Sequence, residues 1–444
     1  MTKRLIFQLG TNNWQRGGEF APGSGILHES HHQAYAAMAD TASYSVYPSS
    51  VQTADDPTVR ILELEHEVPI CESVSPGSSY RFHSMTDDEF DGYRSRLRRF
   101  TEEAIDAAEA AEGVPVSVAI AHHSFLNPFV LSAINAERVA TGRPRFKLLC
   151  FVHGTALKMF AHERAGIDPE YPKRFLPMME QAGIFSPGAG VDLCAAISAE
   201  QIDKFLEVFS DYPRSRMVLS PNGYSTAFFK PDPQAYRDRG RLLREVVLPP
   251  SPADGAPAAI DGDIDKCIVF CGKFADWKRL DALLEAAAVY EADGRVATLI
   301  IGSGPDEAVA HYHRMAYQKL GLTRTYFLGA RPQPEIARFN AMADLGVYPS
   351  RNEPFGLVFI ECMACGTPVI GADSGGPRDF VTDAVGGLVP EAEGEALVQS
   401  LVAKVEEALG EDWKATKGPV AAAYAKATFS TSRQCEDLLA ALDR

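Results

Sequence analysis

Two carboxylates, Glu353 and Glu361, bracket a short turn in the second half of the chain. The apolar run at 343–348 comes just before this turn and predicts a buried strand. We expect the chain to enter a helix at Pro354, because proline has no amide hydrogen to leave unpaired in the first turn of a helix. A strand, a helix N-terminus and two carboxylates at one sheet edge predict a site for a sugar attached to a diphosphate.

The backbone of the turn is expected to hold the phosphate groups. The amides of Phe355, Gly356 and Leu357 would point out of the helix N-terminus, where an anion binds well. Gly356 lets a ligand approach the backbone closely, since glycine has no side chain. Glu361 suits the diol of a ribose, whereas Glu353 is better placed to accept hydrogen bonds from the sugar.

Lysines in a second loop supply fixed positive charge. Lys273 and Lys278 follow the strand predicted at 267–271, and we expect their loop at the same sheet edge as Glu353. A lysine acts as a point charge against phosphate oxygens and can stabilise the charge on a departing diphosphate. Two solvated loop lysines would give the same pattern by themselves, but the Gly272 turn and the distant carboxylates favour a binding role.

Histidines end two strands expected in the first half. The strand at 116–121 ends at His122 and His123, and the strand at 146–152 ends at His153. Strand ends of a parallel sheet adjoin the ligand, so we predict that His153 contacts it and that His122 and His123 are candidates for the acceptor side. A histidine is also often structural, and the sequence leaves that alternative open.

Glycine loops follow two expected strands. Gly17 and Gly18 come after the first strand of the chain, and Gly302 and Gly304 come after the strand at 297–301. Because a doubly wound fold receives its ligand at the loop after its first strand, we assign Gly17 and Gly18 to donor binding. Gly302 and Gly304 are donor-binding candidates through the family resemblance given below. A bare turn after the first strand would use Gly17 and Gly18 in the same way.

The elements that position these residues alternate between strand and helix, which predicts parallel sheets. The predicted fold class is α/β, with two Rossmann-like, doubly wound domains facing each other across a cleft. We place the domains at 1–230 and 266–430, with a helix and a proline-rich linker at 231–265 between them.

Composition excludes several classes of protein. The net charge of −16 argues against a nucleic-acid-binding surface, and no apolar run approaches the ~20 residues of a membrane span. The first residues are too polar for a signal peptide and are better interpreted as a strand. The scattered cysteines fit reduced thiols in a cytoplasmic protein.

Three patterns that could hold a metal are better explained without one. Cys362 and Cys365 have C-x-x-C spacing, but no second Cys or His pair nearby completes a tetrahedral set. The histidines at 28–32 are more typical of a helix face. The acidic run at 261–265 lacks the closing glutamate of a calcium loop.

Taken together, these features in the second half resemble the nucleotide-sugar-dependent glycosyltransferases of the GT-B fold, and are similar to family 4. The two glutamates match the E-x7-E signature of that family. The matching residues are Gly272, Lys273, Lys278, Gly302–Pro305, Tyr348–Ser350, Glu353–Leu357, Glu361, Met363–Ile370 and Gly375–Gly376. The first half matches more loosely, through Gly17–Gly18, His153–Gly154, Ser198 and Pro221–Gly223.

The resemblance implies a role for each matched side chain. Lys278 and Lys273 would bind the donor diphosphate, and Glu361 would bind the ribose. Glu353 and the adjacent backbone would hold the sugar, which His153 would also contact. The expected catalytic centre is therefore His153, Lys273, Lys278 and Glu353.

The resemblance also implies a reaction. A UDP- or GDP-sugar would be the donor, as a substrate and not a cofactor, and the acceptor would be a soluble small molecule or a saccharide. Transfer would retain the anomeric configuration through a front-face mechanism that needs no metal. The last helix, at 431–444, would return to the first domain.

Three residues depart from the family pattern. Lys273 stands where arginine is usual, which keeps the charge but loses the bidentate fork. Cys362 replaces a smaller alanine, which indicates a packing difference, and Asp379 stands where a glutamate is common after the glycine pair.

Two other functions remain open on the same architecture, a nucleotide-sugar 2-epimerase and a non-catalytic nucleotide-sugar binder. An NAD-dependent oxidoreductase is disfavoured, because the Gly-x-Gly at 302–304 lacks the third glycine and the downstream acidic residue of that fingerprint.

Overall fold

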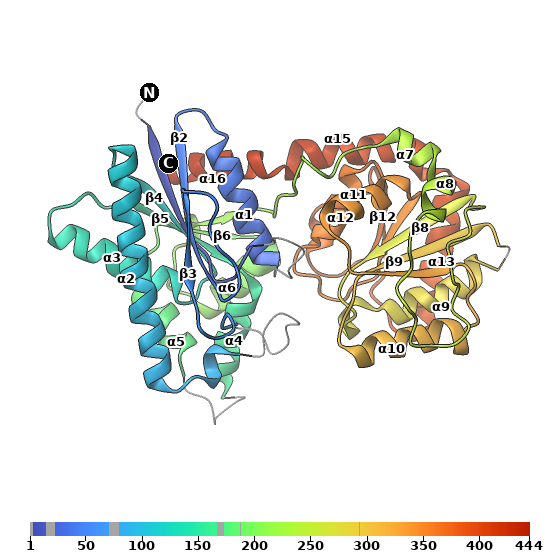
Figure 1. Cartoon of the computed structure of the whole chain (residues 1–444), viewed down its shortest axis with the longest axis horizontal. Helices are drawn as coiled ribbons and strands as arrows, with labels where there is room; N and C mark the ends of the chain where they lie inside the picture. The colour runs from blue at the N-terminus through green and yellow to red at the C-terminus, as the bar shows by residue number, and fades with distance from the viewer. Residues whose placement is uncertain (1–2, 15–22, 71–79, 167–172, 187, 293) are drawn as a thin grey trace. The chain divides into compact units, whose positions relative to one another are not determined.

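The computed structural model describes residues 3–14, 23–70, 80–166, 173–186, 188–292 and 294–444. The chain divides into a first unit, Met1–Asn222 with Thr431–Arg444, and a second unit, Gly223–Ser430 (Figure 1). Each unit has a parallel sheet of its own packed with helices. The predicted α/β fold with two Rossmann-like domains is therefore confirmed.

The sheet of the first unit has the order β3-β2-β1-β4-β5-β6-β7 within the described residues, and its neighbouring strands pair in parallel. The strands are β1 (Arg4–Leu9), β2 (Thr41–Ser49), β3 (Val59–Glu63), β4 (Val116–His122), β5 (Lys147–Val152), β6 (Leu193–Ala196) and β7 (Met217–Leu219). Successive side chains of a strand point to opposite faces. Accordingly, Leu5 and Phe7 of β1 enter one core cluster and Ile6 enters the other.

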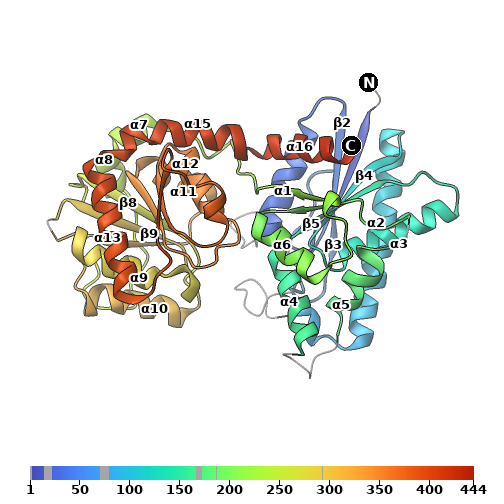
Figure 2. The ribbon, with the colours of Figure 1, turned by 180° about the vertical axis from the view of Figure 1, so that it is seen from behind.

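Helices cover both faces of this sheet. On the face of Ile6 lie α1 (Gly23–Ala36) and α16 (Thr431–Asp443), which contribute Tyr35 and Leu438 to the shared core. Figures 1 and 2 show these two helices side by side. The other helices of the unit are α2 (Asp87–Glu112), α3 (Asn127–Ala140), α4 (Gly154–Ala165), α5 (Phe175–Pro177) and α6 (Ala199–Val208). The last helix of the chain therefore belongs to the first unit.

Local signals fix where these helices start and stop. Thr86 and Glu89 form a capping box at the start of α2, and Gly113 ends it with φ +68°. Ser198, predicted as an N-cap, accepts a 3.2 Å hydrogen bond from the Gln201 amide at the start of α6. Such caps satisfy amides and carbonyls that a helix end leaves without partners.

The sheet of the second unit has the order β10-β9-β8-β11-β12-β13 within the described residues, again in parallel. Its strands are β8 (Lys266–Cys271), β9 (Val296–Ile301), β10 (Thr325–Gly329), β11 (Leu345–Tyr348), β12 (Val369–Ala372) and β13 (Gly386–Val389). The helices are α7 (Pro233–Arg237), α8 (Arg239–Arg244), α9 (Leu280–Tyr290), α10 (Asp306–Arg314), α11 (Gln333–Met342), α12 (Leu357–Ala364), α13 (Gly394–Gly410), α14 (Trp413–Thr416) and α15 (Gly418–Phe429).

The segment 231–265, expected to be a helix and a linker between domains, is part of the second unit. The hydroxyl of Tyr236 donates to the buried Asp344 carboxylate at 2.7 Å, and Arg239 pairs with the same carboxylate at 2.8 Å. Ile260 is buried as well. These contacts fasten the segment to the second sheet, although its proline content is typical of a linker.

None of the helices in the described ranges is long and apolar enough to cross a lipid bilayer.

Candidate functional site

The carboxyl edge of the second sheet joins the two loops that carry the predicted lysines and glutamates. Strands β8 and β11 are parallel neighbours, so the loops that follow them leave the sheet side by side. The ammonium nitrogen of Lys278 lies 2.5 Å from a carboxylate oxygen of Glu353, and both side chains are about one-tenth exposed. The prediction that these two loops share one sheet edge is confirmed.

Lys278 and Lys273 lie in different surroundings. Lys278 ends a 3₁₀ turn, Asp276–Lys278, in which its amide donates to the Ala275 carbonyl at 2.8 Å. Its ammonium group also lies 4.2 Å from the centre of the Trp277 ring. Because a lysine is rarely buried without a partner, the Glu353 carboxylate accounts for the position of this cation. Lys273 is exposed, whereas Lys278 is buried in its ion pair with Glu353.

A pair of glycines supports the turn that carries Glu353. Gly375 has φ +71°, and a side chain there would place its Cβ 2.4 Å from the Glu353 carbonyl oxygen. The amide of Gly376 donates to that same carbonyl at 2.7 Å. On the other side, the amide of Arg351 donates to the Trp277 carbonyl at 2.7 Å. The loop before α9 and the Gly375–Gly376 segment therefore fix the backbone of Glu353 from both sides.

The helix after the turn begins later than the sequence predicted. Helix α12 starts at Leu357, so the prediction that Pro354 takes a first helical position is wrong. The cause is Gly356, which caps the helix with φ +99° and interrupts the helical path. Phe355 is buried instead, with its ring 5.2 Å from that of Phe380. The first-turn amides that have no intrahelical acceptor begin at Leu357.

Glu361 lies one turn further along α12 and is partly exposed. Burial raises the pKa of its carboxyl to about 8. Among the described residues, none donates a hydrogen bond to this carboxylate or forms an ion pair with it. A partly buried carboxylate without a partner is costly, and hydroxyl groups of a ligand would supply the missing hydrogen bonds.

The pKa of the Cys271 thiol, at the end of β8, is affected by the charges of both Glu361 and Lys278. Burial raises its pKa to about 12, with a further increase from the Glu361 carboxylate and a decrease from the Lys278 ammonium. Glu361 and Lys278 therefore act on one small region at the ends of β8 and β11.

Gly302 and Gly304 are explained by close packing of neighbouring loops. Gly302 has φ +138°, and a Cβ there would lie 1.8 Å from the Gly272 carbonyl oxygen. A Cβ on Gly304 would lie 3.0 Å from Phe274, whose amide donates to the Ser303 carbonyl at 2.9 Å. These glycines allow the β9 loop to support the loop that carries the lysines, and their assignment to donor binding stays a prediction.

The histidines predicted in the first unit meet at the carboxyl edge of its own sheet. The ring centres of His123 and His153 are 4.5 Å apart, and those of His122 and His153 are 6.2 Å apart. Burial lowers the pKa of His123 to about 4 and the pKa values of His122 and His153 well below the usual value. At neutral pH these imidazoles are therefore uncharged.

Part of their hydrogen-bonding capacity is unused. One nitrogen of His122 lies 3.2 Å from the Gln8 side chain. The Nδ1 atoms of His122 and His123 and the Nε2 atom of His153 are buried and have no hydrogen-bond partner in the described part of the chain. Neutral imidazoles can donate or accept, which suits hydroxyl groups better than a charged phosphate.

The histidines of α1 extend this group into the core. The rings of His28 and His122 are 4.4 Å apart, and His31 lies 2.8 Å from the Gln434 side chain of α16. His32 bonds to the Ser45 hydroxyl at 2.9 Å. The predicted helix face is therefore a buried one. Across the residues that the structure covers, no cluster of three or more His, Cys, Asp or Glu side chains could hold a metal ion.

Gly17 and Gly18, predicted to bind the donor, lie outside the described residues.

The sequence reasoning missed two arginines beside the lysine loop. Arg279 is buried, has φ +51° and pairs with Glu391. Arg351 lies 3.9 Å from Glu391 and pairs with Glu393. A usable signal was present, because Arg279 directly follows Lys278 at the start of α9. The two arginines tie the loops after β8 and β11 to the segment after β13.

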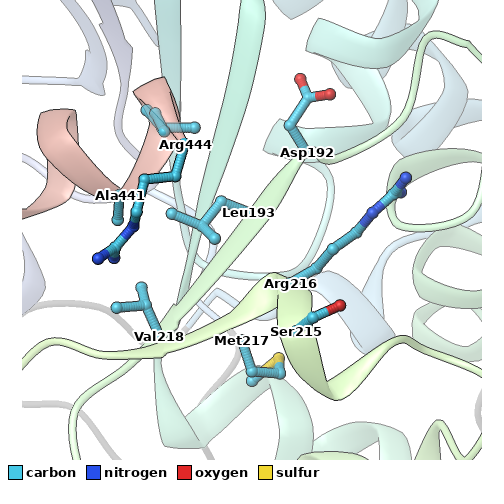
Figure 3. Close-up of a pocket in the computed structure, with 9 residues that line it drawn as sticks. Asp192, Leu193, Ser215, Arg216, Met217, Val218, Ala441 and Arg444 are labelled. Atoms are coloured by element: carbon cyan, nitrogen blue, oxygen red, sulfur yellow. The ribbon is translucent and has the colours of Figure 1, made fainter.

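A cavity of about 450 Å³ lies elsewhere, where β6 and β7 begin. It is lined by Asp192, Leu193, Ser215, Arg216, Met217, Val218, Ala441, Leu442 and Arg444 (Figure 3). Figure 3 shows the side chains of Arg216 and Arg444 pointing in different directions, so they do not converge on one ligand position. This cavity is at the opposite end of the strands from His153.

Comparison with known proteins shows which family and fold the chain resembles. Residues 261–424 match the family model described as "Glycosyl transferases group 1". Solved structures of glycosyltransferases align over nearly the whole chain at 12–21% identity, a likeness of fold. The fold is that of the GT-B glycosyltransferases.

Three solved structures illustrate this likeness of fold. Sucrose-phosphate synthase from Thermosynechococcus elongatus has a TM-score of 0.65 at 21% identity, covering 98% of this chain and 97% of its own. The catalytic domain of starch synthase IV from Arabidopsis thaliana has a TM-score of 0.65 at 14% identity, with full coverage of both chains. Anabaena HepE, in complex with UDP and glucose, has a TM-score of 0.62 at 17% identity and 99% coverage of both chains.

Curated relatives match over part of the chain. The D-inositol 3-phosphate glycosyltransferase of Jonesia denitrificans is 32% identical over 208 residues, 45% of this chain and 46% of the relative. That of Corynebacterium diphtheriae is 29% identical over 271 residues, 56% of this chain and 60% of the relative. The chain spans about half the length of the curated relatives it matches.

Proposed function

We propose that the protein is a retaining glycosyltransferase of the family 4 type that transfers a sugar from a nucleoside-diphosphate sugar to a small-molecule or saccharide acceptor. The single observation that carries the proposal is the contact between Lys278 and Glu353 at the N-terminus of α12. It combines a buried cation, a carboxylate and a helix N-terminus at the carboxyl edge of a parallel sheet, inside the region that matches the family model.

The two lysines and two glutamates of the second unit have separate proposed roles in this reaction. Lys278 and the first amides of α12 stabilise the diphosphate, on which negative charge grows as the sugar departs. Glu353 accepts hydrogen bonds from the sugar, and Glu361 accepts them from the ribose hydroxyls. The exposed Lys273 adds long-range attraction for the anionic donor.

The proposed chemistry is a front-face displacement. The bond between the anomeric carbon and the diphosphate oxygen breaks while the acceptor oxygen bonds to the same face of that carbon. The proton of the acceptor hydroxyl passes to the departing diphosphate oxygen, so no protein side chain has to act as the base. The protein contributes positioning and charge stabilisation.

The histidines of the first unit are proposed to bind hydroxyl groups on the acceptor side. His153 contacts the transferred sugar, and His122 and His123 are the acceptor-side candidates. This proposal is supported by the uncharged state of these imidazoles and by their nitrogen atoms that have no hydrogen-bond partner among the described residues. The curated relatives are named for D-inositol 3-phosphate. For this chain, we propose a cyclic polyol as the first acceptor to test.

A donor screen tests the proposal. UDP-, GDP- and ADP-sugars are added to the protein while the melting temperature is recorded, because a ligand that binds the folded state raises it. We expect one nucleotide class to stabilise the protein. Incubation of that donor with and without acceptor polyols then separates the functions: a transferase makes a glycoside only with acceptor, an epimerase converts the donor alone, and a binding protein does neither.

A further inference from the structure

The Lys278–Glu353 pair has a second consequence, which rests on the proposed function. We propose that Glu353 competes with the donor diphosphate for Lys278, so that the site favours a nucleotide sugar over the bare nucleoside diphosphate. Glu353 would then determine both donor selectivity and the ease of product release.

The first step of the argument is that Glu353 already takes the place of an anion. Its carboxylate lies 2.5 Å from the Lys278 ammonium in surroundings that leave each side chain about one-tenth exposed. Its Cγ lies 3.4 Å from the Cβ position of Gly356, the residue that caps α12. The carboxylate is therefore beside the helix N-terminus and paired with the cation, which are the two features that attract a phosphate.

The second step is that the backbone cannot relieve this competition. Glu353 is held by Gly375 and Gly376, and the Lys278 loop is held by the hydrogen bond from the Arg351 amide to the Trp277 carbonyl. We therefore expect the two side chains, and not the backbone, to reorient when a ligand binds. A lysine has a flexible four-carbon stem, so its ammonium can exchange one acidic partner for another.

The third step is that a nucleotide sugar can replace the hydrogen bond that the Glu353 carboxylate loses, whereas a nucleoside diphosphate cannot. When a diphosphate draws Lys278 away, Glu353 is left buried without its cation, which is costly. A sugar on the diphosphate offers hydroxyl donors to the freed carboxylate. A nucleoside diphosphate lacks that sugar, and its ribose hydroxyls are assigned to Glu361, so it bears the full cost of breaking the pair and binds more weakly.

The test compares Glu353→Gln with the wild-type protein by isothermal titration. UDP, GDP and ADP and their glucose conjugates are titrated to find the nucleotide that binds. Glutamine has the same shape as glutamate but no charge, so Lys278 is released. We expect the nucleoside diphosphate to bind about tenfold more tightly to Glu353→Gln and its glucose conjugate to bind no more tightly than to the wild-type protein.

Glu391→Gln is the matched control. It removes the same charge from the loop after β13, where Glu391 pairs with Arg279 and not with Lys278. We expect it to change nucleoside diphosphate binding less than twofold. Glu353→Asp, which keeps the charge, is expected to bind the diphosphate weakly, as the wild-type protein does, and circular dichroism verifies that each variant is folded.

The outcomes separate the two proposals. If the wild-type protein binds a nucleotide sugar but Glu353→Gln binds the diphosphate no more tightly, or Glu391→Gln tightens it equally, the competition is overturned and the proposed function stands. If neither the wild-type protein nor Glu353→Asp binds any of the nucleotides, both proposals are overturned.

Discussion

The carboxyl edges of the two sheets carry side chains of different character. In the second unit, Lys278 and Glu353 form a buried ion pair, and the Glu361 carboxylate of α12 has no hydrogen-bond or ion-pair partner among the described residues. In the first unit, His123 and His153 are neutral imidazoles with unused nitrogen atoms. One topological position therefore carries two kinds of chemistry: fixed charge suits a diphosphate, and neutral hydrogen-bonding groups suit hydroxyls.

Removing the charge from the second unit should have the largest effect. We expect Lys278→Met to lower kcat/KM at least about 100-fold in a glycosyl transfer assay, because a buried cation stabilises charge better than a solvated one. Lys273→Met is the control, since that lysine is exposed, and should cost about tenfold or less. An equal loss in both variants would contradict the importance of burial.

A substitution at Gly375 can disturb the backbone that positions Glu353 without removing a charge from the Lys278–Glu353 ion pair. Gly375→Ala places a Cβ 2.4 Å from the Glu353 carbonyl oxygen. We expect a loss of about 2 kcal/mol in the free energy of unfolding, together with weaker donor binding. Gly394→Ala also has a left-handed φ, +55°, but meets open space, so it should cost about 1 kcal/mol and leave donor binding intact. Chemical denaturation and donor titration measure both effects.

The raised pKa of Glu361 makes donor binding depend on pH. In the proposed site, ribose hydroxyls would donate to the ionised carboxylate, whereas in the protein without donor the carboxyl binds a proton below a pKa of about 8. Donor affinity should therefore rise with pH, up to about tenfold per unit between pH 6 and pH 8, and level off above. Glu361→Gln should bind more weakly and lose this slope in a titration series. An unchanged slope in the variant would remove Glu361 from the ribose site.

The buried imidazoles should make the first unit the more acid-sensitive one. Burial lowers the pKa values of His31 and His123 to about 4, and those of His28, His122 and His153 also lie well below 6.5. Between pH 6.5 and about 4 the unfolded chain binds more protons than the folded one. Stability is thus complete above pH 6.5 and falls by about 1 kcal/mol per histidine at pH 5.5.

Hydrogen exchange resolved by peptide at pH 7.5 and pH 5.5 measures this difference. We expect protection to decrease in β4, β5 and α1 more than in β8 and β11. Equal loss in both units would show that the histidine cluster is not the acid-sensitive element.

The sequence predicted the fold because alternation of strands and helices is a local signal that two parallel sheets require. It also predicted the proximity of Lys278 and Glu353, since loops after neighbouring parallel strands meet at one edge. It missed β2, which contains Pro48 and several polar residues and does not form a continuous apolar run. It placed the start of α12 too early, because the residues before Gly356 pack against the distant Gly375–Gly376 segment, which approaches Glu353, Pro354 and Phe355.

Long-range partners explain the remaining differences. His31 of α1 finds its hydrogen-bond partner in Gln434, which is about four hundred residues away in sequence. The pairing of Arg279 with Glu391 joins the loops after β8 and β13, and no local pattern indicates it. Propensity and spacing describe neighbours along the chain, whereas these side chains find their partners only once the sheet is assembled.

The most direct test of the central claim is hydrogen exchange with the nucleotide sugar that the donor screen selects. The central claim is that the diphosphate binds at the Lys278 loop and the N-terminus of α12. We predict increased protection in peptides that cover 272–279 and 353–361, with the amides of Leu357 and Val358 among the most protected. Protection confined to other segments, with these two unchanged at saturating nucleotide sugar, would contradict the claim.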